Sequence, residues 1–234
     1  MTGQLFWDVD TQVDFMLPHG KLYVRGAEAL APNLALLTNH AHENGIRILA
    51  SSDNHDQGDE EISENPDFKS TFPPHCLRGT EGQTRIAETT LRDPLVIEPD
   101  AVAPGVLAKL EHHHGDLLFH KRFFDVFTNP NLVPVLNALR VSRVVLYGVA
   151  LDVCVRHAVE GLLRHFPDTP IAIVTDAVQA LDEGARPRLL DDWQARGATL
   201  TLTREVLRRC SARTRRAGRG RRVPGSVPPP LPRS

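Results

Sequence analysis

The sequence predicts a three-layer α/β/α fold around a mostly parallel, Rossmann-like central sheet. Short apolar runs alternate with longer helical patterns along the chain, and the apolar runs end in polar residues. This alternation is typical of a parallel sheet that helices cover on both faces. The length of 234 residues, with 41% hydrophobic and 24% charged residues, is that of a globular chain with one large core.

The first half of the chain supplies three predicted strands. Residues 4–10 (QLFWDVD) form the first, and residues 26–45 follow as a helix that Gly45 ends. Residues 46–53 (IRILASSD) form the second strand, and a long loop from Asn54 to Gly82 follows it. Residues 93–99 (DPLVIEP) form a short third strand.

The second half continues the alternation. Residues 115–121 (GDLLFHK), 142–149 (SRVVLYGV) and 170–176 (PIAIVTD) are predicted strands, and residues 198–203 (ATLTLT) are a predicted edge strand. Helical patterns lie at residues 130–139, 155–165 and 183–196. The run His112 to His114 is interpreted as a solvated turn, because three adjacent side chains cannot readily face one ion.

Charge is distributed unevenly along the chain. Residues 208–234 hold nine of the 27 basic residues and no acid, so the rest carries 18 bases against 29 acids. This end is rich in Arg, Pro, Gly and Ser and poor in apolar residues. We expect residues 1–207 to form one domain and residues 208–234 a disordered basic tail. An arginine run can contact nucleic acid, but a solvated tail is the favoured interpretation.

The sequence favours a cytoplasmic protein without a membrane partner. No segment resembles a secretory signal, and no run approaches the roughly 18 apolar residues of a membrane helix. The three cysteines, Cys76, Cys154 and Cys210, are odd in number and far apart, which favours reduced thiols.

Polar residues follow several predicted strands, at the sheet edge where open α/β sheets bind ligands. Cys154 lies at a strand-to-helix junction, where the helix dipole and a cation such as Lys121 can lower the pKa of a thiol. Asp10 could act as the base. Each residue alone could have a structural role, but the three together favour a cysteine nucleophile.

The long loop holds a second group of residues. Asp53 and His55 form an Asp-x-His pair, and His75 lies in FPPHC. Nitrogen and oxygen ligands of this kind suit Zn²⁺ or another divalent metal, such as Mn²⁺ or Fe²⁺. A further ligand could come from Glu60, Glu61 or Glu64. The alternative is an ordinary polar loop, since Asp-x-His alone is a weak signal.

These segments together resemble the isochorismatase-like cysteine hydrolases. Residues 8–15 (DVDTQVDF) resemble the family's Asp-x-Gln-x-Asp-Phe opening, and residues 148–155 (GVALDVCV) its Gly-Val-Ala-x-Asp-x-Cys nucleophile segment. Residues 51–55 (SSDNH) and 71–82 (TFPPHCLRGTEG) are similar to metal-binding segments of the nicotinamidase branch, which hydrolyses nicotinamide to nicotinate and ammonia. The resemblance covers residues 5 to about 207 in the right order.

The resemblance implies a catalytic triad, a set of metal ligands and a ring pocket. The triad is Asp10, Lys121 and Cys154, and the ligands are Asp53, His55 and His75. Phe15 and Phe72 would wall the ring pocket, and a cis peptide between Val149 and Ala150 would help to orient an oxyanion hole. A small amide substrate, a role in NAD salvage and a homo-oligomer are also implied.

Three features depart from the family pattern. Leu151 stands where the family usually has Thr, and Phe72 stands where many nicotinamidases carry Trp. No second His follows His55 before His75, and Glu64 occupies the replacement position with Glu61 as its competitor. Another small amide, a carbamoyl compound or isochorismate is therefore the alternative substrate, and a non-catalytic binding protein is the less favoured alternative.

Overall fold

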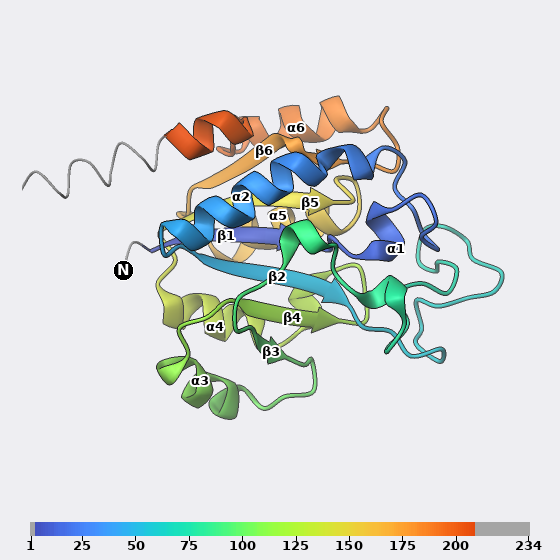
Figure 1. Ribbon diagram of the computed structural model, residues 1–234, viewed down its shortest axis with the longest axis horizontal. Coiled ribbons are helices and arrows are strands. Elements are labelled where there is room, and N and C mark those ends of the chain that lie inside the picture. The colour runs from blue at the N-terminus through green and yellow to red at the C-terminus, as the bar shows by residue number, and fades with distance from the viewer. Residues whose placement is uncertain (1–2, 209–234) are drawn as a thin grey trace, which may run out of the picture.

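The computed structural model describes residues 3–208, which are built around a seven-stranded sheet with the order β3-β4-β2-β1-β5-β6-β7 (Figure 1). Every pairing between neighbouring strands is parallel. The strands are β1 (Gln4–Val9), β2 (Arg47–Asp53), β3 (Leu95–Ile97), β4 (Leu117–Lys121), β5 (Arg143–Val149), β6 (Ile171–Gln179) and β7 (Thr199–Thr201). The predicted fold class is confirmed, with β7 at a sheet edge as expected.

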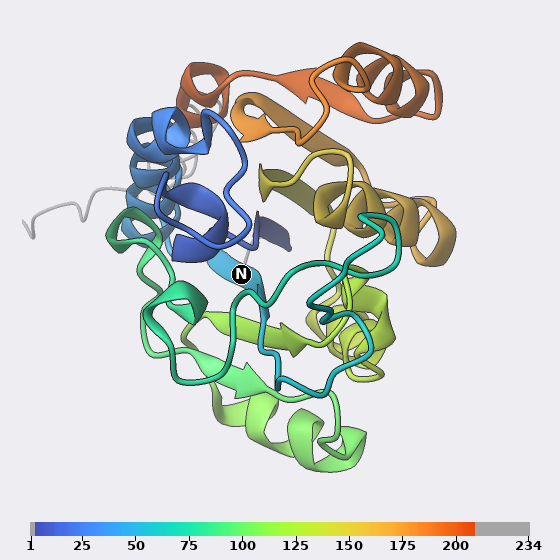
Figure 2. The same ribbon diagram turned by 90° about the vertical axis from the view of Figure 1, so that its right-hand side faces the viewer.

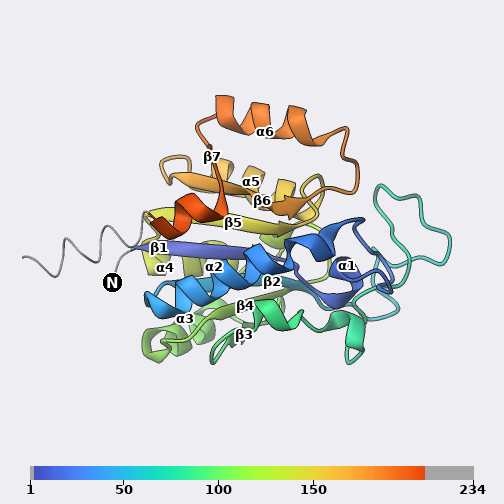
Figure 3. The ribbon, with the colours of Figure 1, turned by 45° about the horizontal axis from the view of Figure 1, so that its top comes forward.

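Helices cover both faces of this sheet. On one face lies α2 (Ala31–Glu43), and a helical segment that begins at Thr203 lies on the same side (Figure 3). On the other face lie α4 (Leu132–Leu139), α5 (Cys154–His165) and α6 (Arg186–Ala195) (Figure 2). The helix α3 (Ala103–His112) packs against α4. Short 3-10 turns are η1 (Ala27–Leu30), η2 (Glu81–Gln83), η3 (Ala87–Thr89) and η4 (Val126–Thr128).

Several elements differ from the sequence prediction. The helix α3 was not predicted, because its start reads Ala-Pro-Gly, which resembles a turn, although proline is well accommodated in the first helical turn. His112 ends α3 rather than lying in a turn. The single-turn α1 (Val13–Met16) was also missed, and the predicted 26–45 helix is divided into η1 and α2. The strand β6 continues to Gln179, past an irregularity in its pairing with β5.

The central strands are buried on both faces, which explains their nearly continuous apolar sequences. Trp7 in β1 and Tyr147 in β5 are fully buried. Gly148 allows β5 to approach β1: its φ is 120°, and an added Cβ would lie 2.0 Å from the Val9 carbonyl oxygen. A side chain at this position would push apart the two strands whose ends carry the site.

The carboxyl ends of four strands meet at one edge of the sheet. The strand β1 has β2 on one side and β5 on the other, so the order in which strands are added to the sheet reverses there. Open α/β sheets bind ligands at such a point. Asp10 follows β1, Asp53 and Lys121 end β2 and β4 opposite each other in register, and Cys154 begins α5 after β5. The sheet therefore brings these residues together from distant parts of the sequence.

In residues 3–208 no helix is long and apolar enough to cross a membrane. The predicted basic tail lies outside this range, apart from Arg208, so its disorder and the domain boundary after residue 207 stay predictions.

Candidate active site

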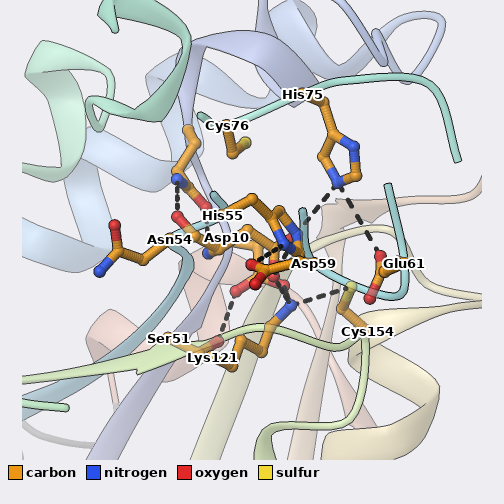
Figure 4. A network of polar contacts seen from close by, with 12 residues as sticks. Asp10, Ser51, Asn54, His55, Asp59, Glu61, His75, Cys76, Lys121 and Cys154 are labelled. Carbon is orange, nitrogen blue, oxygen red and sulfur yellow. Dashed lines mark hydrogen bonds and ion pairs between the residues drawn. The ribbon is translucent and has the colours of Figure 1, made fainter. Parts of the chain in front are cut away.

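Asp10, Lys121 and Cys154 form one buried group at this edge (Figure 4). The Lys121 Nζ atom lies 3.0 Å from Asp10 Oδ2 and 3.6 Å from Cys154 Sγ, and it also donates to Asp53 Oδ1. One carboxylate oxygen each of Asp10 and Asp53 lies within 4.8 Å of Cys154 Sγ. A buried ammonium group is therefore surrounded by two carboxylates and a thiol.

The backbone around Asp10 is held in an uncommon conformation. Asp10 has a φ of 49°, in the left-handed region that Asp tolerates better than most residues. Ser51 on the neighbouring strand fixes it twice: the Asp10 N–H donates to the Ser51 carbonyl at 3.2 Å, and the Ser51 hydroxyl donates to Asp10 Oδ1 at 2.7 Å. The other carboxylate oxygen is left to face Lys121.

Burial controls the protonation of this group. It raises the pKa of the Cys154 thiol well above its ordinary value, and the nearby Lys121 lowers it only in part. Burial likewise raises the pKa of Asp10. Burial opposes the charge on Lys121, but the Asp10 and Asp53 carboxylates outweigh it and raise the lysine pKa well above its ordinary value. The pKa of the Cys154 thiol is therefore raised and not lowered as the sequence led us to expect, so the thiol needs a base.

A second group adjoins the first through Asp53. Asp53, His55, Glu61 and His75 are buried, and one ligand atom of each lies within 4.8 Å of the others. The His75 Nε2 atom is 3.6 Å from Asp53 Oδ2 and 3.9 Å from Glu61 Oε1, while His55 Nε2 is 3.8 Å from Asp53 Oδ1. These separations exceed hydrogen-bond length and surround a common centre.

The residues of this group fit a divalent metal ion. His55 Nε2, His75 Nε2 and Glu61 Oε2 are buried and have no hydrogen-bond partner among residues 3–208. Each histidine instead uses its Nδ1 atom outside the group, with Asp59 Oδ2 at 3.2 Å and with the Pro73 carbonyl at 2.8 Å. Buried polar atoms are rarely unpaired, and such outer contacts orient metal-binding imidazoles. Two nitrogens and two carboxylates are a ligand set that zinc accepts.

The fourth member of the group is Glu61, which corrects the prediction of Glu64. Glu61 is only 2% exposed, whereas Glu64 lies on the surface. Two backbone hydrogen bonds set this orientation: the Phe72 N–H donates to the Glu61 carbonyl at 2.8 Å, and the Ser63 N–H donates to the Phe72 carbonyl at 2.9 Å. Burial, assisted by Asp53, raises the pKa of Glu61 to about 7.

A pocket with about 320 Å³ of empty volume joins the two groups. Its wall includes Cys154 and Ala150 on one side, Asp53, Glu61 and His75 on another, and the rings of Phe15, Phe72 and Phe124. The Phe15 and Phe72 ring centroids lie 5.4 and 6.3 Å from that of His75. Both predicted ring residues therefore reach the pocket.

Two further residues clarify the pocket wall. Phe124 was not predicted, because it lies in the irregular segment between β4 and η4, where no periodic pattern marks it. Leu151, the departure from the family pattern, is fully buried and does not line the pocket. Its side chain therefore does not narrow the space beside the nucleophile.

The turn into α5 carries candidate oxyanion donors. The predicted cis peptide between Val149 and Ala150 is present. The N–H groups of Leu151, Val153 and Val155 donate to backbone carbonyls, at 2.8, 3.1 and 3.0 Å. The N–H groups of Ala150 and Cys154, two residues that line the pocket, are then the candidates to face an oxyanion.

The opening motif also holds a supporting residue, Gln12, for which the sequence predicted no role. The Gln12 side chain donates to the Asp53 carbonyl at 2.8 Å and accepts from the Asp53 N–H at 2.7 Å. It also donates to the Gln83 carbonyl at 2.8 Å. Gln12 thus ties the end of β2 to the segment after the long loop, and its sequence signal is its place in the Asp-x-Gln-x-Asp-Phe opening.

The isochorismatase domain family matches residues 8–205. The chain belongs to this family. It is 30% identical over 164 residues to the nicotinamidase/pyrazinamidase of Mycobacterium tuberculosis, covering 67% of this chain and 77% of that protein. The crystal structure of pyrazinamidase/nicotinamidase from Streptococcus mutans is 28% identical, with a TM-score of 0.65 over 84% of this chain and 99% of that one.

The fold is also shared with a pyrazinamidase from Pyrococcus horikoshii that was crystallised with zinc. That chain is 21% identical, with a TM-score of 0.68, and the match covers 86% of this chain and 99% of that one. The predicted resemblance to the isochorismatase-like hydrolases, on their nicotinamidase branch, is confirmed. The chain is an amide-hydrolysing enzyme of this family.

Proposed function

We propose that the protein is a metal-containing cysteine amidohydrolase that converts nicotinamide and water to nicotinate and ammonia. The observation that carries the proposal is the single pocket onto which the Cys154 thiol, three aromatic rings and the metal-ligand group all open. A thiol beside a base can attack an amide carbonyl, and aromatic rings can contact the faces of a planar substrate. Nicotinamide uses all of these features.

The reaction begins at the thiol. Asp10 takes the Cys154 proton, and the thiolate attacks the amide carbon to give a tetrahedral intermediate. The N–H groups of Ala150 and Cys154 stabilise its oxyanion. Asp10 then returns the proton to the leaving nitrogen, ammonia departs, and a thioester remains. Asp10 next takes a proton from water, which attacks the thioester, and nicotinate leaves as the thiol is restored.

The electrostatics of the triad support this assignment. Burial raises the pKa values of both Cys154 and Asp10, so a proton moves between two groups that are shifted in the same direction. Lys121 remains charged throughout, because its two carboxylate neighbours raise its pKa. Its ammonium group stabilises whichever of the two partners carries the negative charge.

In this proposal the metal ion contributes to the recognition of the substrate. Asp53, His55, Glu61 and His75 would hold a divalent ion, with Zn²⁺ favoured over Mn²⁺ or Fe²⁺. When bound, the ion supplies a Lewis acid that can accept the lone pair of a ring nitrogen. Phe15 and Phe72 restrict the ring to one plane, and the carboxamide is directed to Cys154.

We place the enzyme in the cytoplasm and in NAD salvage as part of the same proposal. The free thiols of Cys76 and Cys154 support a reducing compartment.

The test measures ammonia release from nicotinamide, pyrazinamide, benzamide and N-carbamoyl compounds, and the loss of substrate for isochorismate, which contains no nitrogen, with Cys154→Ala as the blank. Nicotinamide is expected to have the highest kcat/KM, and benzamide, which lacks the ring nitrogen, one at least about tenfold lower. Equal values for benzamide and nicotinamide would remove the recognition role of the metal. A kcat/KM about tenfold higher for a non-aromatic substrate than for nicotinamide would refute the assignment as a nicotinamidase. The assignment as a cysteine hydrolase would stand.

A further inference from the structure

The catalytic pocket continues outward into a larger chamber. Five residues line both spaces: Leu22, Phe72, Phe124, Val153 and Leu181. The empty volume, which includes open solvent in both cases, is about 1170 Å³ for the outer chamber and about 320 Å³ for the inner pocket. An aromatic carboxamide placed in the inner pocket, with its carbonyl at Cys154, would leave the outer chamber to water. The site can therefore hold a longer molecule than nicotinamide.

One wall of the chamber is apolar and exposed. The Phe68 and Leu181 side chains line it and are 64% and 43% exposed, among the most exposed large apolar residues of the described chain. Asp67 holds the Phe68 loop, since its carboxylate accepts hydrogen bonds from the N–H groups of Lys69, Ser70 and Thr71. The Phe68 ring meets Phe72 edge-on, with centroids 6.4 Å apart. A fixed aromatic surface thus extends the ring pocket outward.

The same chamber contains two cations without partners. The side chains of Arg156, in the first turn of α5, and Lys69 make no hydrogen bond or ion pair with any residue in the range 3–208. Glu160, one turn after Arg156, is already held by Arg196 at 2.7 and 2.8 Å and by Trp193 at 2.9 Å. The Arg156 guanidinium group is therefore open to a ligand.

The carboxylates of Asp152 and Asp182, which line the chamber, accept hydrogen bonds from backbone N–H groups. The Asp152 carboxylate accepts from the N–H groups of Leu181 and Asp182, at 2.9 and 2.8 Å, and Asp182 accepts from Gly184 at 2.9 Å. The His157 ring contacts Phe124 in a tilted arrangement, with centroids 4.8 Å apart and an interplanar angle of 41°, and its Nδ1 is 3.8 Å from Asp125. The Lys and Arg side chains of the chamber that have no partner among residues 3–208 are thus Arg156 and Lys69.

We propose that the outer chamber is a substrate subsite for an anionic arm. The substrate class is an aromatic carboxamide that carries a short arm ending in a carboxylate, and this inference rests on the proposed amidase function. Arg156 binds the carboxylate through paired N–H donors, with Lys69 as a second cation. Phe68 and Leu181 contact the apolar part of the arm while the carboxamide lies at Cys154.

The experiment compares two nicotinamide analogues that differ only in charge. One bears a propionate arm on ring carbon five, and the other a neutral hydroxypropyl arm on the same carbon. The wild-type enzyme is expected to favour the propionate analogue by about fivefold in kcat/KM, and added salt should reduce this preference. Arg156→Met, which keeps the aliphatic stem, should bring the ratio close to one. Arg164→Met, the same change on an exposed residue of α5, should leave the ratio as in the wild type.

A direct binding measurement separates the subsite from turnover. Calorimetric titration of Cys154→Ala with both analogues should show the same preference, mainly as a lower Kd for the propionate analogue. Equal kcat/KM values for the two analogues in the wild type, or an equal change of the ratio in Arg164→Met, would overturn the subsite while nicotinamide hydrolysis stands. Hydrolysis of the propionate analogue without hydrolysis of nicotinamide would instead refute the proposed function and support the subsite.

Discussion

The proposed catalytic triad and the proposed metal-ligand group lie in contact, yet the chain builds them differently. Lys121 ends β4, Asp10 directly follows β1, and Cys154 begins α5 after β5, so the parallel sheet brings the three residues together. Three of the four proposed metal ligands lie instead in the loop between β2 and η2, where hydrogen bonds to carboxylates and carbonyls orient them. The nucleophile therefore depends on the sheet, and the ligand set depends on loop contacts.

The largest expected effect comes from the strand-end group. Cys154→Ala should lower kcat by at least about 10³-fold, because no other group can form the thioester. The ligand atoms of the metal group are untouched by this change, so metal content should stay at about one ion per chain. Ammonia release and elemental analysis of the same preparation check both expectations.

Alkylation of the wild type distinguishes the nucleophile from a buried structural cysteine. Cys154 lines the pocket, whereas Cys76 is fully buried with its Sγ 3.7 Å from the Gly82 carbonyl. Iodoacetamide should label Cys154 before Cys76, and inactivation should follow that labelling. Faster labelling of Cys76, with loss of activity, would contradict the assignment.

The next effect concerns the loop group and separates two neighbouring acids. Glu61→Gln removes a buried carboxylate that faces His75 and should weaken metal binding by at least about tenfold. Glu64→Gln is the matched control, because the same change on the surface should leave metal binding as in the wild type. Dialysis against graded chelator, followed by elemental analysis, compares the variants. A weaker site in Glu64→Gln with an unchanged Glu61→Gln would restore the original prediction.

These two groups also show what the sequence could and could not predict. Asp10, Lys121 and Cys154 were found because strand ends are visible as polar residues after apolar runs, and parallel strands share one edge. Glu61 and Glu64 have the same chemistry three residues apart, and only the backbone pairing of Glu61 with Phe72 decides between them. Phe124 was missed for a related reason, since no periodic pattern marks a residue in an irregular segment.

A smaller effect is expected at Gln12, which holds Asp53 at the junction between the proposed triad and the proposed metal-ligand group. Gln12→Leu removes the side chain that pairs with both backbone groups of Asp53, so these buried groups lose a partner. The free energy of unfolding should fall by roughly 1–3 kcal/mol, which lowers Tm by several degrees. Gln194→Leu, on the exposed face of α6, should change Tm by about a degree or less. Equal Tm values for the two variants would show that Gln12 does not hold the strand end.

The smallest effect is expected at the basic end of the chain, beyond the described residues. Deletion of residues 213–234 removes seven arginines and few apolar side chains, so little buried surface can be lost. Tm should change by about one to two degrees at most, and kcat/KM for nicotinamide should stay the same within experimental error. Thermal unfolding and ammonia release of the truncated and full chains provide the measurement. A large fall in either quantity would mean that this segment packs against the domain, and that the boundary predicted after residue 207 is wrong.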